Sequence, residues 1–124
     1  MHREGLVVIA LMCLGAIRPA VAADAEAGKA VFERCKICHT VEAGGRNGVG
    51  PNLHAIFGRK AGTLDGFTYS EAMKSSGIVW DDDTMAKYLR SPREVVAGGK
   101  MAFPGIKEDD QLANVIAYLH QATQ

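Results

Sequence analysis

Residues 35–39 read CKICH, and this short sequence constrains the fold more than any other part of the chain. Two thiols three positions apart point to the same side of one helical turn, so Cys35 and Cys38 can reach one flat partner together. His39 follows directly and supplies a nitrogen ligand. This is the attachment pattern of c-type haem, in which both thiols add to the porphyrin and the histidine binds the iron. A fold built on this motif has to enclose a large cofactor.

Three other interpretations of the two cysteines find less support. A thioredoxin-like dithiol is typical of a βαβ unit, and the sequence has no such pattern. A closed zinc site needs four ligands, but His54 and His120 lack ligand spacing. Two structural cysteines beside an incidental histidine would close almost no loop as a disulfide. We therefore predict haem attachment.

The N-terminus predicts a cleaved export signal over residues 1–22. A short polar start precedes an apolar run at residues 6–17, and Ala20-Val21-Ala22 is a small-residue cleavage pattern. The run is shorter than the ~20 residues that a spanning helix needs. Cys13 lies inside it and should leave with the signal. We predict cleavage after Ala22, with Ala23 as the alternative, and one domain over residues 23–124 in the periplasm.

The charge balance excludes two classes of partner. The chain has fourteen Lys and Arg against fourteen Asp and Glu, and loss of Arg3, Arg18 and Glu4 with the signal leaves twelve against thirteen. Bulk binding to nucleic acid or to an anionic membrane needs a clear basic excess. We expect neither, and we expect a monomer with no membrane span after cleavage.

The apolar patterns predict an all-α domain with long loops. Helices are expected at residues 24–35, at residues 70–75, from the acidic caps at 81–84 to residue 90 or 91, where Pro92 ends it, and from residue 108 onward. The last is the clearest, since its apolar residues at 112, 115, 116 and 119 share one face. Residues 44–66 contain seven glycines and predict irregular loops, which a buried cofactor would give a surface to pack on.

A second protein ligand to the iron distinguishes a carrier from a catalyst. Two protein ligands let the iron change oxidation state with no bond made or broken, whereas an open position favours gas or peroxide chemistry. The candidate ligands are Met73, Met85, Met101, His54 and His120. Met85 shares a helical stripe with Leu89, as core residues do, and His54 in a loop is expected at the surface. Met101 in a glycine-rich segment is favoured on position alone, and the others stay open.

From residue 28 to the C-terminus the chain resembles class I cytochromes c of the mitochondrial and alphaproteobacterial kind. The resemblance rests on GKAVFERCKICHTVE, GVGPNLHAIFGRKAG, FTYSEAMKSSGIVW and KMAFPGIKEDDQLANVIAYL. It implies the small cytochrome c fold, with three main helices, a short helix and long loops around one haem c held by Cys35 and Cys38. It also implies that Met101 is the second axial ligand with His39, a pair that raises the reduction potential.

The same resemblance implies supporting roles around the haem. The Pro51 carbonyl is expected to hold the His39 ring, and Tyr88 is expected to reach the Met101 sulfur. The expected donors to the haem propionates are Arg59, Tyr69 and Trp80. A role as core aromatics is the alternative, or an addition, for Tyr69, Trp80 and Tyr88. The expected close crossing of the first and last helices involves Gly28, Phe32 and Tyr118.

Three departures from the family pattern lie near the expected pocket. The family often has asparagine at the position of Met73, proline at that of Ala97 and threonine at that of Gly99. Glycine adds unfolded-state freedom and proline would restrict it, so the loop before Met101 is expected to be loose. We expect Met101 to be displaced at mildly alkaline pH, with Lys100 as a candidate replacement.

The resemblance implies a diffusible electron carrier and not an enzyme. It would take single electrons from a quinol-oxidising membrane complex and pass them to a terminal oxidase, peroxidase or photosynthetic reaction centre. The cations that match the family's haem-edge ring are Lys29, Arg34, Arg46, Arg93, Lys100 and Lys107. They should steer the haem edge toward acidic partners, although a merely solvated surface is the alternative. A peroxide or gas-binding haem protein, and a haem subunit held permanently by a dehydrogenase, are the competing functions.

Overall fold

The computed structural model describes residue 15 and residues 22–124, so most of the predicted signal peptide lies outside the described residues. The helices are α1 (Ala25–Phe32), α2 (Glu71–Lys74), α3 (Asp82–Arg90), α4 (Pro92–Val95) and α5 (Asp109–Ala122). Within the described part of the chain, the extended backbone pairs only at one isolated bridge, between Lys60 and Val79. The all-α prediction with three main helices and long loops is therefore confirmed. None of the described helices is long and apolar enough to cross a membrane.

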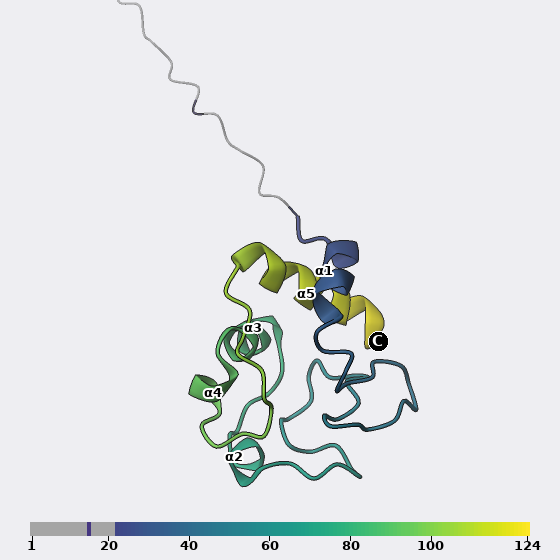
Figure 1. The fold of residues 1–124 in the computed structure, drawn as a ribbon, viewed down its shortest axis with the longest axis vertical. Coiled ribbons are helices and arrows are strands. Elements are labelled where there is room, and N and C mark those ends of the chain that lie inside the picture. Colours follow the sequence, from purple (N-terminus) through teal and green to yellow (C-terminus); the bar gives the residue numbers. More distant parts are fainter. Residues whose placement is uncertain (1–14, 16–21) are drawn as a thin grey trace, which may run out of the picture.

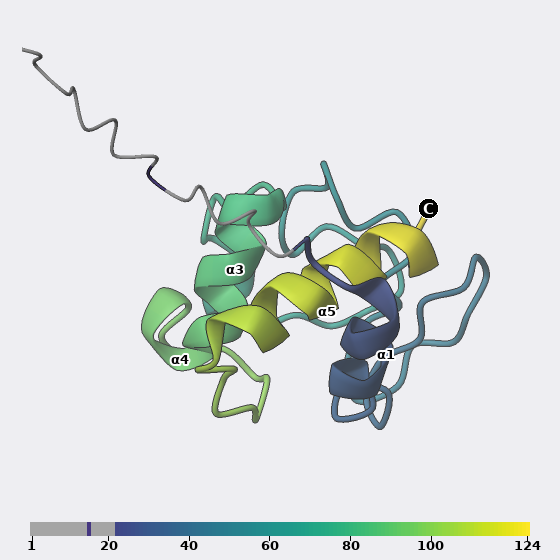
Figure 2. The ribbon, with the colours of Figure 1, turned by 90° about the horizontal axis from the view of Figure 1, so that it is seen from above.

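The first and last helices cross closely, and this crossing organises the fold (Figures 1 and 2). A Cβ on Gly28 would lie 1.9 Å from the Asn114 carbonyl oxygen, so only glycine fits there. The rings of Phe32 and Tyr118 lie 5.2 Å apart beside it. The Asp24 carboxylate caps α1, and the Asp24 amide donates to Asn114 Oδ1 at 2.8 Å. The predicted crossing is confirmed.

The helices α2, α3 and α4 lie on one side of the crossing, and long loops lie on the other (Figure 1). A capping box between Asp81 and Thr84 starts α3, as the acidic run predicted. The α3 helix contacts both α4 and α5. The buried apolar residues come from all these parts: Phe32, Ile56, Ala61, Trp80, Met85, Tyr88, Leu89, Val96, Ile106, Leu112, Val115, Ile116 and Leu119.

Two helix boundaries differ from the predictions. Regular α1 ends at Phe32 and not near Cys35, because the Lys36 and Cys35 amides both turn back to the Phe32 carbonyl and tighten the chain into turns. Pro92 does end α3, but it also starts the short helix α4, which we did not predict. Proline suits the first position of a helix, because its missing N–H has no partner there. We interpreted Pro92 only as the end of α3, so its second role was missed.

The isolated bridge ties two loop segments together across the fold. The Gly58 amide donates to the Trp80 carbonyl at 2.7 Å, and the Trp80 amide donates to the Arg59 carbonyl at 3.0 Å. The Ala61 amide donates to the Ile78 carbonyl at 2.8 Å. These bonds bring the Arg59 and Trp80 side chains to one region of the molecule.

Candidate haem site

The CKICH segment forms a single tight turn directly after α1. The Cys38 and His39 amides both donate to the Cys35 carbonyl, at 3.0 and 2.9 Å. Both thiols are free and half-buried. Burial raises the pKa of the Cys35 thiol, and the neighbouring Arg34 guanidinium partly opposes this shift. The turn therefore presents two thiols and an imidazole within five residues.

A largely apolar cavity of ≈ 250 Å³ lies against this turn, between α1, α3, α5 and the loops. All nine predicted site residues line it: Cys35, Cys38, His39, Pro51, Arg59, Tyr69, Trp80, Tyr88 and Met101. They come from five separated parts of the chain. The fold thus brings together, around one space, residues that are up to 66 positions apart in sequence.

The His39 ring is held from behind by a loop. Its Nδ1 lies 2.7 Å from the Pro51 carbonyl oxygen, which assigns the proton to Nδ1 and leaves Nε2 as the free ligand atom. A Cβ on Gly50 would lie 2.3 Å from the ring carbon Cε1. Burial lowers the pKa of His39, and the bond to Pro51 acts weakly in the opposite direction. The ring is therefore neutral at neutral pH, as a metal ligand must be.

A buried asparagine supports the same loop. The Asn52 side chain, 8% exposed, donates to Thr40 Oγ1 at 2.7 Å and to the Glu42 carbonyl at 2.9 Å. The backbone N–H of Asn52 donates to Asn47 Oδ1 at 2.8 Å. These bonds tie the chain after His39 to the segment that carries Pro51. We did not predict this role, because a loop asparagine gives no sign in the sequence of whether it is buried.

Three methionine sulfurs line the cavity, and one of them has a polar contact. Tyr88 Oη donates to Met101 Sδ at 3.8 Å, whereas Met73 and Met85 line the cavity without such a bond. Met85 is buried on α3, as the helical stripe predicted. Burial raises the pKa of Tyr88 to about 12, so its hydroxyl stays protonated and able to donate. The expected contact between Tyr88 and Met101 is therefore present.

The two histidine candidates lie outside the cavity. His120 on α5 pairs with the Asp82 carboxylate and stacks on Phe57 with ring centroids 3.7 Å apart. We expected His54 at the surface, and this is wrong: it is half-buried, and its Nδ1 is enclosed without a partner. Neither lines the cavity that holds Cys35 and Cys38.

Arg59 provides the observation that tests whether a haem fits. Its Nη2 donates to the His54 carbonyl, but its Nη1 is buried with no hydrogen-bond partner among the described residues. A buried guanidinium N–H without a partner lowers the stability of the fold, and Arg59 is one of the residues that line the cavity. A carboxylate on the bound group would satisfy it. Two free thiols, an imidazole, a thioether and this guanidinium form the donor set that an iron porphyrin with propionates requires.

A zinc centre finds no such support. Among the residues that the structure describes, no three His, Cys, Asp or Glu side chains come together to hold a metal ion.

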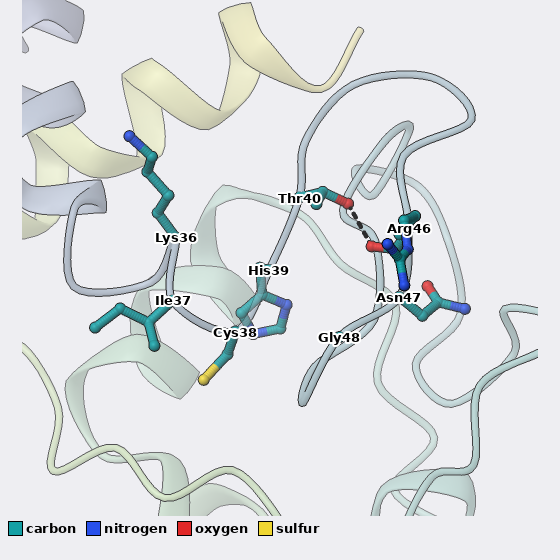
Figure 3. Close-up of a pocket in the computed structure, with 8 residues that line it drawn as sticks. All are labelled: Lys36, Ile37, Cys38, His39, Thr40, Arg46, Asn47 and Gly48. Carbon is teal, nitrogen blue, oxygen red and sulfur yellow. Dashed lines mark hydrogen bonds between the residues drawn. The ribbon is translucent and has the colours of Figure 1, made fainter.

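A second, small pocket of ≈ 190 Å³ lies on the outer face of the turn, between Lys36, Cys38 and the loop at Arg46 (Figure 3). The Thr40 hydroxyl closes that pocket by donating to the Arg46 carbonyl at 2.8 Å.

Comparisons with known proteins agree with this donor set. The Cytochrome c family model matches residues 25–123. The chain is similar to cytochrome c2 of Blastochloris viridis, 42% identical over 94% of this chain and 89% of that protein. It is similar to cytochrome c2 iso-2 of Magnetospirillum molischianum, 52% identical over 78% of this chain and 96% of that protein. Among solved structures, it resembles cytochrome cH from Methylobacterium extorquens with a TM-score of 0.75 and 43% identity, over 80% of this chain and 99% of that one.

Proposed function

Because the chain belongs to the cytochrome c family, with one covalently attached haem c and the work of an electron carrier, we propose that it shuttles single electrons between proteins in the periplasm. The donor is a quinol-oxidising membrane complex, and the acceptor is a terminal oxidase, peroxidase or photosynthetic reaction centre. The predicted small cytochrome c fold is confirmed by the structural match. The observation that carries the proposal is the single cavity lined by Cys35, Cys38, His39 and Met101.

In the proposed site, Cys35 and Cys38 would hold the haem covalently, and His39 and Met101 would be the protein ligands of its iron. The haem supplies an iron that accepts and releases one electron. The Pro51 carbonyl binds Nδ1 of the His39 ring and leaves Nε2 free as the ligand atom, and Tyr88 donates its hydroxyl to the Met101 sulfur. With both side chains bound, the ligand set would stay the same in both oxidation states, and no position would be left for a substrate.

Arg59, Tyr69 and Trp80 are proposed to bind the propionates. The buried Arg59 Nη1 supplies an unpaired donor for this role. The Trp80 ring packs on Tyr88 with centroids 5.1 Å apart, and Tyr69 packs edge-on against Phe67 at 4.9 Å. These aromatic contacts orient the side chains and cover the cavity at the same time.

The proposed docking face surrounds the part of the cavity next to Cys38. Arg34 and Lys100 line the cavity, and Arg46 lies beside Cys38 in the outer pocket. Two apolar side chains stand exposed there, Ile37 at 84% and Val49 at 82%. Cations around an apolar centre suit brief encounters with an acidic partner.

Spectroelectrochemical titration of the purified haem protein tests the carrier proposal. We expect a reversible one-electron wave, a thioether-to-ferric charge-transfer band, and no carbon monoxide binding to the ferrous form at neutral pH. Carbon monoxide binding would favour a gas or peroxide-reactive protein instead. The mass of the exported protein tests cleavage, which predicts a chain starting at residue 23.

The docking face is tested by charge reversal. Arg46→Glu should slow association with the acceptor and weaken its dependence on ionic strength, because it removes an attractive charge from the face. Lys87→Glu is the matched control, since Lys87 lies on α3 and pairs with Asp83. Equal effects of the two variants would favour a merely solvated surface.

A further inference from the structure

Residues 105–107 dock on the C-terminal end of α3. The Ile106 amide donates to the Leu89 carbonyl at 2.9 Å. The Lys107 ammonium donates to the Arg90 carbonyl at 2.6 Å. The last carbonyls of a helix have no partner within the helix, so two of those of α3 are satisfied here by residues 17 positions further along the chain. A lysine at this end also complements the helix dipole.

The docking is reciprocal. Arg90 Nη1 donates to the Lys107 carbonyl at 3.2 Å, and Arg90 Nη2 pairs with the Asp109 carboxylate. The Lys107 ammonium also lies 3.3 Å from Ser91 Oγ. We call residues 89–91 together with residues 105–107 the stem. Each of the two segments of the stem therefore contributes a cation that donates to a carbonyl of the other segment.

Gly105 allows this close approach. Its φ is +108°, and a Cβ there would lie 2.1 Å from the Arg90 carbonyl oxygen and 3.1 Å from Lys107 Nζ. Next to it, Ile106 is only 1% exposed and anchors residues 105–107 in the core. Residues 105–107 therefore pack closely against the end of α3.

The stem closes the loop of residues 92–104, which contains Met101. In this structure none of the amides of residues 100–105 donates a hydrogen bond to the described part of the chain. Side chains fasten the loop instead: Lys100 Nζ donates to the Thr68 carbonyl at 3.0 Å, and Tyr88 reaches Met101. The position of Met101 therefore depends on how the two ends of its loop are held.

We propose that Lys107 is a positioning residue for Met101: by capping α3 it closes the Met101 loop and limits how often that loop opens. This inference rests on the proposed role of Met101 as an iron ligand. It assigns the Lys107 ammonium to the stem and not to the docking face, where its match to the family ring would place it. Five residues, 102–106, separate Lys107 from Met101 along the chain.

The test measures loop opening with a small competing ligand. Imidazole binds the ferric iron only when Met101 has left, so its apparent affinity reports the open fraction of the loop. For Lys107→Met we expect the affinity to rise about three- to tenfold, because a charge-assisted hydrogen bond at an exposed site is lost. Lys107→Arg keeps a donor and a charge and should stay within about twofold of the wild type. Lys87→Met removes the same charge from the surface of α3 and is the control, with no change expected.

Amide hydrogen exchange gives a second readout that does not depend on iron ligation. Exchange at the hydrogen-bonded amides of Val96, Gly99 and Ile106 should speed up in Lys107→Met by a similar factor, and exchange in α5 should not change. Equal imidazole affinity and equal exchange in Lys107→Met and Lys87→Met would overturn the inference. A wild-type ferric protein without the thioether band would instead remove Met101 as ligand and the proposed site with it, while the exchange comparison would still decide the role of the stem.

Discussion

His39 and Met101 line the same cavity, but different kinds of contact hold them. The His39 ring is bonded to a backbone carbonyl at 2.7 Å and backed by Gly50, in a loop whose own buried bonds converge on Asn52. Met101 stands in a segment, residues 100–105, whose amides donate no hydrogen bond to the described part of the chain, and it is held by the Tyr88 hydroxyl and by the ends of its loop. The His39 side is therefore fixed by backbone packing, whereas the Met101 side is adjustable through single side chains.

The largest effect is expected from adding one methyl group on the His39 side. Gly50→Ala would place a Cβ 2.3 Å from the His39 ring, which cannot retreat because Pro51 lies behind it. We expect a loss of about 3 kcal/mol in the free energy of unfolding, measured with urea on the haem-loaded protein. Gly44→Ala is the control, since its Cβ would meet nothing within 4 Å and only the positive φ of 72° costs stability, about 1 kcal/mol. Equal losses of unfolding free energy in the two variants would show that the His39 side of the cavity adapts to the added methyl group.

Removing the sulfur on the Met101 side should change ligation more than folding. Met101→Ala is expected to cost roughly 2 kcal/mol, because a half-buried side chain is lost. Its ferrous form should bind carbon monoxide at neutral pH, since the coordination position is open, and its reduction potential should fall. Met73→Ala removes a second thioether from the same cavity and should keep the charge-transfer band. Loss of the band in Met73→Ala alone would reassign the ligand.

The Tyr88 hydroxyl predicts how the Met101 side responds to alkaline pH. The pKa of Tyr88 is raised from 10.0 to about 12 in the folded chain, so the folded state favours the protonated hydroxyl. The associated stability is fully present below pH 10 and is lost as the pH rises toward 12, up to about 2 to 3 kcal/mol. Tyr88→Phe has no ionisable group there and should lack this loss, while Tyr69→Phe should keep the wild-type profile. Parallel unfolding curves of Tyr88→Phe and the wild type across this range would contradict the assignment.

The smallest effect is expected from stiffening the Met101 loop. Ala97 donates no backbone hydrogen bond among the described residues, and Val96 before it has an extended φ of −124°. Ala97→Pro should therefore stabilise the protein by about 0.5 kcal/mol through the unfolded state. The pH at which the charge-transfer band disappears should rise slightly. A fall in that pH would mean that the loop needs its freedom to place Met101.

The sequence predicted the His39 side better than the Met101 side, for a physical reason. Cys35, Cys38 and His39 are neighbours in sequence, so one turn of chain fixes their arrangement. Helices with a clear apolar stripe, above all α5, could be predicted from the sequence equally well. Met101 could be chosen over Met73 and Met85 only through the family resemblance, because the loop that positions it is shaped by contacts with residues far away in sequence.

The errors follow the same division. The burial of His54 and the support from Asn52 depend on loops folding back on each other, and single residues in loops carry no periodic signal. The reciprocal contacts of Arg90 and Lys107 were also not predicted, since a lysine on the surface and a lysine that caps a helix look alike in sequence. Matching Lys107 to the family ring gave its place along the chain but not the direction of its side chain.

The crossing of α1 and α5 sets the order in which this protein can fold. The crossing joins residues about 90 positions apart, so the core around Gly28 cannot form until the last fourteen-residue helix has been synthesised. Until then the two cysteines just after α1 lie in open chain, where burial does not yet raise the pKa of Cys35. The Cys35 thiol is therefore more easily deprotonated before the ends of the chain meet than after.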